Sequence, residues 1–412
     1  VRTSIFVSGC THHCKGCFNE IAWDFNYGTP FTDATISDII NSGGDYEVAD
    51  IARDGVEGFE KIVSNPSLYD AIIMDINMPR MNGIELLREL HNNHIEQTVI
   101  VVSTVAKEGA KETIQALEYG AFDFVTKPEN YFETKGEAFR NQIHAMLDAA
   151  TSSRPSAAKA AQAPARPVRT TIHQPAGTTV SGASRPASRI ATSPATSRVG
   201  TPDSVIRPDE GRAKGVKSGR KKLVALACST GGPKSLQQVI PYLPENLDAG
   251  VVLVQHMPKG FTSSLAQRLN ELSHVTVKEA EEGDVIRKGW VYIAPGGRHI
   301  RVDSKGTDYV IRLSDEDPVE GLRPCANIMY DSLTKSRFDE ITCVVLTGMG
   351  ADGTKGIKNL KDAGRPIHVI GQDEQSCVVY GMPKALAQAG LTDEVVPLNQ
   401  IADAITKNVG VL

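Results

Sequence analysis

The sequence predicts an α/β protein with two doubly wound parallel-sheet domains joined by a disordered linker. Short apolar runs alternate with amphipathic stretches of helical spacing before residue 150, and again after residue 220. Such alternation is typical of parallel sheets covered by helices. Residues 151–220 are instead rich in Ser, Pro, Ala, Thr and Arg. They contain almost no large apolar side chains, so burial cannot offset their chain entropy.

Four strand-like runs and the helical stretches that follow them predict the first domain. The runs that we expect as strands are YEVADIA (46–52), DAIIMD (70–75), TVIVVS (98–103) and FDFV (122–125). The stretches that we expect as helices are GVEGFEKIV (55–63), GIELLRELHNN (83–93), AKETIQALEYG (110–120) and EAFRNQIHAMLDAA (137–150). Helices between successive strands favour a parallel sheet.

The same alternation after the linker predicts a second parallel sheet. Its expected strands are LVALA (223–227), GVVLVQ (250–255), ITCVVL (341–346) and PIHVIG (366–371). Its expected helices are residues 233–243, 262–272, 326–333, 353–364 and 383–390. A further pair of runs, WVYIAP (290–295) and YVIRLS (309–314), predicts a hairpin inserted into this domain.

Composition excludes several classes of protein. A net charge of −5 indicates no nucleic-acid partner. No apolar run approaches the roughly 18–20 residues of a membrane span. Cys10, His12 and His13 fall where a signal peptide would have its apolar core. We therefore expect a cytoplasmic protein that is not inserted directly into a membrane.

Three predicted strands of the second domain lead into residues suited to ester hydrolysis. Ser229 and His256 follow two of them directly, and Asp352 lies in the glycine-rich segment after a third. Open parallel sheets bind ligands outside the carboxyl ends of their strands, so these side chains are expected to meet in one crevice. His256 would take the serine proton, and Asp352 would orient the imidazole.

Each of these residues alone has a simpler interpretation. Residues 229–232 could cradle a phosphate, His256 could be a hydrogen-bonded structural histidine, and Asp352 could cap the following helix. The chain order Ser, His, Asp differs from the Ser, Asp, His order of α/β-hydrolases, and the G-x-S-x-G motif is absent from the sequence. Only the joint placement at strand ends favours catalysis.

Several motifs of this region occur together in one known family. They are CSTGGP (228–233), QHMP (255–258), APGGRH (294–299), LTGMGADG (346–353) and SCVVYGMP (376–383). Residues 221–410 thereby resemble the catalytic domain of the CheB family, the chemotaxis protein-glutamate methylesterases. The resemblance implies hydrolysis of glutamyl methyl esters, and deamidation of certain glutamines, on methyl-accepting chemoreceptors.

The same resemblance implies roles for individual residues. Ser229, His256 and Asp352 take the triad roles, the backbone groups of Thr230 and Met349 become oxyanion donors, and the esterase needs no cofactor. One departure from the family is Cys228, where a small Ala is usual. We expect this difference to have little effect.

Asp75 and Ser103 end two successive predicted strands, and Lys127 lies just after the next one. With these residues, 34–130 resemble a flavodoxin-like response-regulator receiver, the usual N-terminal partner of this esterase. The resemblance implies that Asp75 accepts a phosphoryl group from a chemotaxis histidine kinase with Mg²⁺ bound. Ser103 and Lys127 would be the switch residues. In the family, the unphosphorylated receiver covers the active site, and phosphorylation relieves the block.

The predicted receiver is incomplete, because its first strand and the acidic pair that holds Mg²⁺ are missing. Losing about four buried apolar side chains would cost roughly 6–12 kcal/mol at ~1.5–3 each. That rivals the roughly 5–15 kcal/mol stability of a whole domain. Residues 4–7 (SIFV) could pair as a substitute strand, but the polar stretch after them argues against it. We expect Asp75 to be phosphorylated poorly, and the receiver either to stop docking, leaving the esterase constitutively active, or to unfold.

A cysteine motif lies close to the first residue. Cys10, Cys14 and Cys17 have the Cys-x-x-x-Cys-x-x-Cys spacing that holds three irons of a [4Fe–4S] cluster and leaves the fourth open for S-adenosylmethionine. Three unrelated thiols, or a zinc site with His12 or His13, are alternatives. Residues 1–32 resemble the radical-SAM activating protein of anaerobic ribonucleotide reductase. Only its cluster loop is present, so we do not expect radical chemistry.

The sequence therefore predicts four segments. They are a radical-SAM-activase-like fragment (1–32), a receiver lacking its first strand (33–150), a linker (151–220) and a methylesterase domain (221–412). The predicted function is that of a serine-type carboxylic-ester hydrolase in chemotaxis adaptation, with impaired receiver control. The alternative is a non-catalytic two-component signalling scaffold, in which Ser229 would be dispensable.

Overall fold

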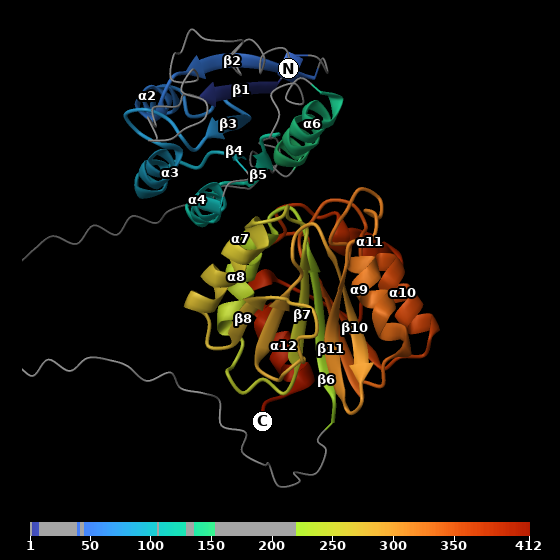
Figure 1. The fold of residues 1–412 in the computed structure, drawn as a ribbon. Helices are drawn as coiled ribbons and strands as arrows, with labels where there is room; N and C mark the ends of the chain where they lie inside the picture. The colour runs from blue at the N-terminus through green and yellow to red at the C-terminus, as the bar shows by residue number, and fades with distance from the viewer. Residues whose placement is uncertain (1, 8–38, 42–44, 105–106, 129–135, 153–219) are drawn as a thin grey trace, which may run out of the picture. The chain divides into compact units, whose positions relative to one another are not determined.

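The computed structural model describes residues 2–7, 39–41, 45–104, 107–128, 136–152 and 220–412. These residues contain two parallel sheets with helices packed against them (Figure 1). The predicted α/β fold class is therefore confirmed. The predicted linker lies almost entirely outside the described residues. None of the described helices is long and apolar enough to span a bilayer.

The first sheet has five parallel strands in the order β2-β1-β3-β4-β5. Its strands are β1 (Arg2–Val7), β2 (Tyr46–Ala52), β3 (Ala71–Asp75), β4 (Val99–Ser103) and β5 (Asp123–Thr126). The helices that follow or separate them are α2 (Gly55–Ser64), α3 (Gly83–Asn92), α4 (Lys107–Glu118) and α6 (Glu137–Ser152). Every residue of β3 and β4 is buried, which explains their continuous apolar runs.

The N-terminal segment occupies the position of the strand that we expected to be missing. Residues 4–7 pair with residues 71–74 of β3, and β1 also pairs along β2 with one register shift after Ser4. The sequence predicts a sheet without this strand, and that prediction is wrong. Residues 4–7 form the substitute strand instead. A parallel ladder is built from backbone N–H and C=O groups, so a segment of unrelated sequence can complete it.

The second sheet has seven parallel strands in the order β14-β13-β12-β6-β7-β9-β8. Its strands are β6 (Lys222–Cys228), β7 (Gly250–Gln255), β8 (Thr276–Glu279), β9 (Trp290–Ile293), β12 (Glu340–Val345), β13 (Ile367–Gln372) and β14 (Glu394–Val396). Its α-helices are α7 (Gly232–Val239), α8 (Phe261–Leu272), α9 (Ala326–Ser332), α10 (Thr354–Asp362), α11 (Met382–Gln388) and α12 (Ile401–Val409). The short 3₁₀ turns are η3 (Ile240–Tyr242), η4 (Leu333–Lys335) and η5 (Leu398–Gln400).

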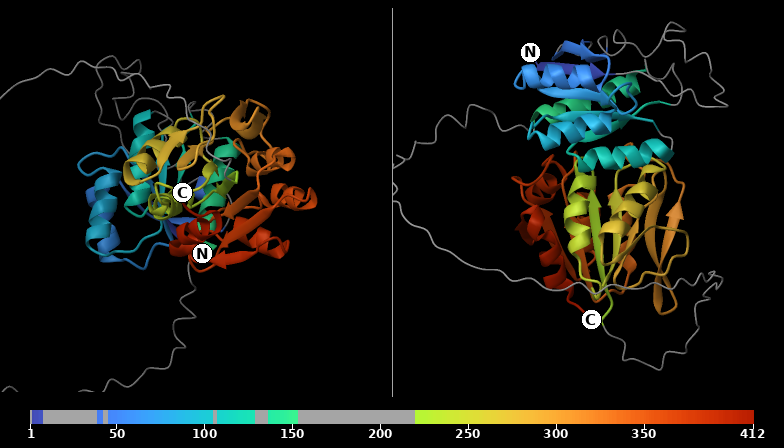
Figure 2. Two further views of the ribbon diagram at one scale, coloured as in Figure 1. Left: turned by 90° about the horizontal axis from the view of Figure 1, so that it is seen from below. Right: turned by 90° about the vertical axis from the view of Figure 1, so that its left-hand side faces the viewer.

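Helices cover both faces of this second sheet (Figures 1 and 2). Along β6, Val224 and Leu226 belong to the apolar cluster that includes side chains of α7, α8 and α12. Leu223 and Ala225 belong to the cluster that includes side chains of α9, α10 and α11. Because successive strand residues point to opposite faces, a strand buried on both faces needs an unbroken apolar run.

The predicted hairpin of residues 290–295 with 309–314 is wrong. β9 lies in the main sheet between β7 and β8, whereas β11 (Asp308–Ser314) pairs antiparallel with β10 (His299–Lys305). The chain reverses at Gly306, whose φ of 63° favours glycine. We missed β10 because HIRVDSK alternates polar and apolar residues without a continuous apolar run.

Candidate active site

Loops at the carboxyl edge of the second sheet hold the predicted catalytic residues. Ser229 follows β6, His256 follows β7, and Asp352 lies in the loop between β12 and α10. β6 pairs with β7 on one side and with β12 on the other. The three loops therefore leave neighbouring strands at the same edge, as the strand-end argument predicts.

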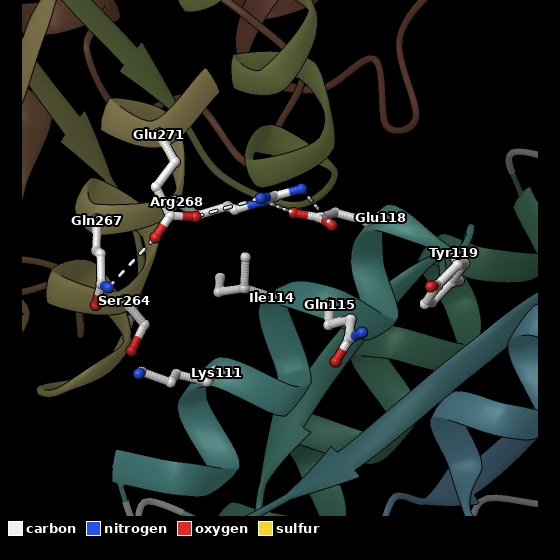
Figure 3. A pocket seen from close by; sticks show the side chains of 9 residues that line it. All are labelled: Lys111, Ile114, Gln115, Glu118, Tyr119, Ser264, Gln267, Arg268 and Glu271. Atoms are coloured by element: carbon white, nitrogen blue, oxygen red, sulfur yellow. Dashed lines mark hydrogen bonds and ion pairs between the residues drawn. The ribbon is translucent and has the colours of Figure 1, made fainter. Parts of the chain in front are cut away.

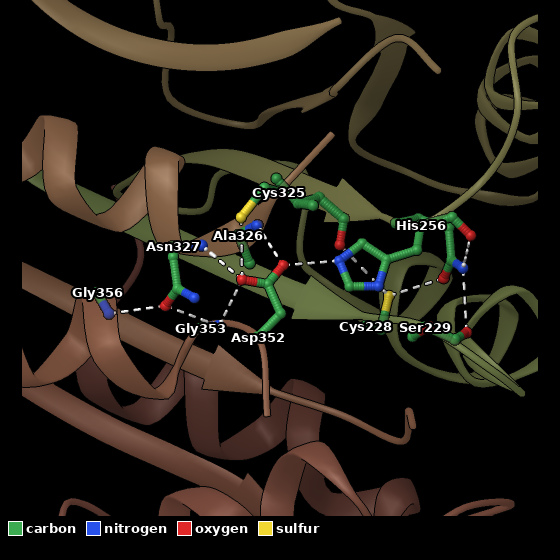
Figure 4. Close-up of polar contacts among 11 residues, drawn as sticks. Cys228, Ser229, His256, Cys325, Ala326, Asn327, Asp352, Gly353 and Gly356 are labelled. Atoms are coloured by element: carbon green, nitrogen blue, oxygen red, sulfur yellow. Dashed lines mark hydrogen bonds and ion pairs between the residues drawn. The ribbon is translucent and has the colours of Figure 1, made fainter. Parts of the chain in front are cut away.

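The imidazole of His256 contacts the carboxylate of Asp352 (Figure 4). The distance from Nε2 to Oδ2 is 2.8 Å, and the two side chains are 9% and 2% exposed. A carboxylate at Nε2 favours a proton on that nitrogen. Nδ1 is then the ring nitrogen that remains free to accept a proton from a serine hydroxyl.

The Asp352 carboxylate lies among backbone N–H donors. Oδ2 accepts from the Ala326 amide at 2.6 Å, while Oδ1 accepts from the Asn327 and Gly353 amides at 2.9 Å each. Burial raises the pKa of Asp352, but the hydrogen bond and charge of His256, together with the Ala326 and Asn327 amides, outweigh it and lower the pKa below its usual value. The carboxylate therefore stays ionised beside the imidazole.

Two side chains that sequence reasoning missed hold the loop of Asp352. Asn327 Oδ1 accepts from the Gly353 and Gly356 amides at 3.1 and 2.8 Å (Figure 4). Cys325 Sγ donates to Asp352 Oδ1 at 3.2 Å. Burial and the nearby Asp352 charge raise the pKa of Cys325 to about 12, so the thiol remains a donor. No local signal in the sequence marks either residue, because both contacts join segments about 26 residues apart.

Close backbone packing shapes the loop of Ser229. The Ser229 amide donates to the Thr347 carbonyl at 3.0 Å, and the Thr347 hydroxyl donates to the Thr230 carbonyl at 3.0 Å. A Cβ on Gly348 would lie 2.8 Å from Ser229 Cβ. Gly231, with φ of 75°, immediately precedes helix α7 and would clash with Val378 if it carried a Cβ. The glycines therefore permit close packing of the Ser229 turn against the loops after β12 and β13.

The predicted oxyanion donors lie in the same two loops. Thr230 is buried and Met349 is 40% exposed. Among residues 220–412, no hydrogen bond uses the backbone N–H of either residue. Both groups therefore remain available for a developing negative charge.

The predicted phosphorylation residues lie at strand ends of the first sheet. Asp75 ends β3, is 6% exposed, and forms an ion pair with Lys127 Nζ. Ser103 ends the neighbouring strand β4, but its hydroxyl accepts from Thr113 Oγ1 at 2.6 Å and donates to the Gly109 carbonyl at 3.2 Å. The structure thus brings Lys127 to Asp75, whereas the Ser103 hydroxyl bonds to helix α4.

Two protein-family models match the chain. The model described as CheB methylesterase matches residues 224–405, and the model described as Response regulator receiver domain matches residues 30–134. A protein-glutamate methylesterase/protein-glutamine glutaminase of Symbiobacterium thermophilum is 38% identical over 92% of this chain and 94% of its own length. Protein-glutamate methylesterase/protein-glutamine glutaminase 1 of Vibrio cholerae is 39% identical over 91% of this chain and 95% of its own length. This chain belongs to the CheB family.

Solved structures of CheB domains also match parts of the chain. The catalytic domain of Thermotoga maritima CheB is 42% identical, covers 46% of this chain and 99% of its own, and has a TM-score of 0.44. The response regulator domain of Thermotoga maritima CheB is 30% identical, covers 38% and 99%, and has a TM-score of 0.29.

Membership of the CheB family makes this chain a hydrolase with a receiver domain. It gives no support to the resemblance of residues 1–32 to a radical-SAM activating protein, because neither family model includes residues 1–29. Cys10, Cys14 and Cys17 lie outside the described residues. Within the described ranges, no group of three or more His, Cys, Asp or Glu could hold a metal ion. The proposed iron–sulfur cluster is therefore unsupported.

The CheB receiver implies Mg²⁺ beside Asp75, and the donors described here do not fit it. Asp54 Oδ1 caps helix α2 through the Val56 and Glu57 amides, and Asp54 Oδ2 pairs with Arg80. The residues after β1 read Ser-Gly-Cys, with no carboxylate. Mg²⁺ needs hard oxygen ligands in octahedral geometry, and Asp75 alone supplies too few.

Receiver side chains contact the esterase within the compact unit of residues 1–154 and 220–412. Arg268 on α8 forms two hydrogen bonds with Glu118 at the end of α4, Nε–Oε1 at 2.5 Å and Nη2–Oε2 at 3.1 Å (Figure 3). The rings of Phe124 and Phe261 stack with centroids 4.8 Å apart. The bidentate ion pair and the aromatic stack both contribute to the contact between the two domains.

Asp123, at the start of β5, reaches the loop that contains Ser229. Its Oδ2 accepts from the Gly231 amide at 3.2 Å, two residues after Ser229. Burial raises the pKa of Asp123 to about 6, although hydrogen bonds from the Phe124 and Gly231 amides and the Thr230 side chain oppose the rise. Sequence reasoning missed Asp123 because it reads as the one polar residue of an apolar run.

Proposed function

We propose that this chain hydrolyses glutamyl methyl esters on chemoreceptors, and deamidates specific receptor glutamines, during chemotaxis adaptation. The observation that carries the proposal is the 2.8 Å contact of His256 with Asp352, at a sheet edge where the Ser229 loop leaves the neighbouring strand. The curated relatives are named protein-glutamate methylesterase/protein-glutamine glutaminase, which agrees with this activity. The three members of such a triad act as nucleophile, general base and orienting carboxylate.

In the proposed mechanism, Ser229 Oγ attacks the ester carbonyl carbon while His256 Nδ1 takes the hydroxyl proton. The N–H groups of Thr230 and Met349 stabilise the resulting oxyanion. The C–O bond to the methoxy group then breaks, and His256 returns its proton so that methanol leaves. Water, deprotonated by His256, hydrolyses the glutamyl–serine ester and restores Ser229. With a glutamine substrate, ammonia leaves in place of methanol.

We propose that a chemotaxis histidine kinase is the natural phosphodonor of the receiver, and that the protein works in the cytoplasm. We also propose that Asp75 is phosphorylated poorly. Among the residues that the structure describes, the shortage of oxygen donors for Mg²⁺ beside Asp75 supports this. Receiver control through phosphorylation would then be impaired.

The decisive experiment measures methanol release from methylated chemoreceptor by the full chain and by Ser229→Ala. We expect the variant to lose activity by a factor of about 10³ or more, because no nucleophile remains. Ser304→Ala, at an exposed position of β10, is the matched control. If Ser229→Ala releases methanol at the wild-type rate, the assignment of Ser229 as the nucleophile is wrong.

A further inference from the structure

A buried amide lies between the proposed nucleophile and the proposed base. Gln255 is the last residue of β7 and is 2% exposed. Its Nε2 donates to the backbone carbonyl of Ser229 at 3.0 Å and to that of His256 at 3.1 Å. One side chain therefore ties together the backbones of both residues.

The hydrogen-bond partners at this position require an amide. Two carbonyl oxygens need two N–H donors, and Cys228 Sγ lies 3.0 Å from Gln255 Oε1 and donates to it. Burial raises the pKa of the Cys228 thiol, so it keeps its proton. Glutamine offers two donors and an acceptor, whereas an ionised glutamate has no donor and a lysine has no acceptor.

The surrounding backbone holds this amide in place. A Cβ on Gly232 would lie 2.0 Å from Gln255 Oε1, so only glycine leaves room for the amide. The Gly232 amide donates to the Ser229 carbonyl at 2.7 Å, and the His256 amide donates to the Cys228 carbonyl at 3.2 Å. Gln255 is thus part of a fully paired buried network, and such networks specify one arrangement of the groups that they join.

We propose that Gln255 is a positioning residue for ester hydrolysis, which holds the Ser229 and His256 backbones at a fixed separation. This inference rests on the proposed triad. The separation of the two backbones sets the geometry in which the serine proton passes to the imidazole. A displacement of about 1 Å in such a geometry slows the chemical step by up to about 100-fold. Substrate binding depends on other groups and changes little.

Gln255→Met in the full chain tests the proposal, because methionine has a similar length and no N–H donor. We expect kcat for methanol release to fall by about 10- to 100-fold while KM stays within about twofold. Gln388→Met, at an exposed position of α11, is the matched control. A wild-type kcat for Gln255→Met would overturn the proposal. Ser229→Ala is measured in parallel, and activity in that variant would mean that the triad itself is wrong.

A second variant separates positioning from loss of folding. Gln255→Glu keeps the shape of the side chain, and its carboxyl donates one hydrogen bond when protonated and none when ionised. We therefore expect the kcat of Gln255→Glu to fall further below wild type as pH rises through the pKa of the new carboxyl. The unfolding temperature is measured in the same buffers. If the dependence of kcat on pH is the same in Gln255→Glu and wild type, the proposal is wrong. If kcat of the variant falls only at the pH values where its unfolding temperature also falls, Gln255 has a merely structural role.

Discussion

At the scale of single residues, the site depends on a buried carboxylate that keeps its charge. Asp352 accepts from His256 and Ala326 through Oδ2, and from Asn327 and Gly353 through Oδ1. A carboxylate with several such donors ionises readily even when water is excluded. The same bonds fix its orientation, so Asp352 both stabilises the loop and selects the tautomer of His256.

Asp352→Asn should therefore impair catalysis more than folding. An amide can present N–H to the imidazole, which favours the tautomer with the proton on Nδ1, where it cannot accept from a serine. We expect kcat to fall by about 10³- to 10⁴-fold. Methanol release from methylated chemoreceptor checks this, with circular dichroism to confirm the fold. An activity within tenfold of wild type would show that Asp352 does not orient the base.

Stability at acid pH should also depend on Asp352. Its pKa is lowered in the folded protein from the ordinary value of 3.8. The ionised group therefore stabilises the fold fully above about pH 4, and this contribution is lost as pH falls through the lowered pKa. We expect the difference in unfolding free energy between wild type and Asp352→Asn to shrink below about pH 4. Urea unfolding followed at a series of pH values measures it, and a constant difference would contradict the assignment.

At the scale of elements, strand ends decide where the chemistry lies. β6, β7 and β12 are neighbours, so the loops after them meet although they are far apart in the sequence. The first sheet follows the same rule, with Asp75 at the end of β3 and Ser103 at the end of β4. In that sheet β1 lies between β2 and β3, and its backbone N–H and C=O groups form hydrogen bonds with both neighbours.

Phe6→Pro should destabilise the first sheet selectively. A proline within a central strand removes one ladder N–H and leaves a carbonyl unpaired, at a cost of about 1–3 kcal/mol or more. We expect faster hydrogen–deuterium exchange in residues 46–126 of the variant. Residues 220–412 of the same sample serve as the control and should exchange at the wild-type rate. Unchanged exchange in residues 46–75 would mean that β1 does not complete the sheet in solution.

At the scale of the whole molecule, the receiver contacts the esterase, while the described residues around Asp75, the predicted phosphorylation residue, include no fitting set of Mg²⁺ ligands. Asp123 reaches the Gly231 amide, two residues after the proposed nucleophile, and Glu118 pairs with Arg268. This arrangement differs from both outcomes that we expected from the incomplete sequence, an undocked receiver or an unfolded one. It favours a receiver that stays in contact with the esterase.

A small phosphodonor should therefore have little effect. We expect acetyl phosphate with Mg²⁺ to change the rate of methanol release by less than about twofold, because the described residues near Asp75 supply too few oxygen ligands for the metal. Phosphate-binding gel electrophoresis reports the fraction of chains that carry a phosphoryl group, with Asp75→Asn as the unreactive control. A stimulation of tenfold or more that is lost in Asp75→Asn would contradict impaired phosphorylation.

Charge reversal at the ion pair should release the receiver. Arg268→Glu and Glu118→Arg each replace attraction by repulsion, whereas the double variant restores an opposite pair. Because Arg268 is 37% exposed, solvent screens the pair, and we expect each single variant to raise methanol release by about two- to fivefold. The double variant should return toward the wild-type rate. Equal rates in all four proteins would mean that this contact does not restrain the esterase.

The sequence by itself determined the two parallel sheets and the strand ends at which Ser229, His256 and Asp352 lie. These follow from local information, because buried parallel strands need unbroken apolar runs and their carboxyl ends share one edge. The same local information misassigned β10, whose alternating residues carry no strong signal, and it did not place β1. Pairing of a strand depends on available backbone partners elsewhere in the chain.

Only the tertiary structure decided which polar groups meet in the site. Gln255 lies against Ser229, Asn327 holds the Gly353 turn, and Asp123 reaches Gly231 from the other domain. Each of these contacts joins residues more than 20 positions apart, and no local pattern encodes such a distance. Buried polar groups must find partners, so the fold as a whole selects them. The sequence specifies where the chemistry occurs, and the packing of distant segments specifies how it is held.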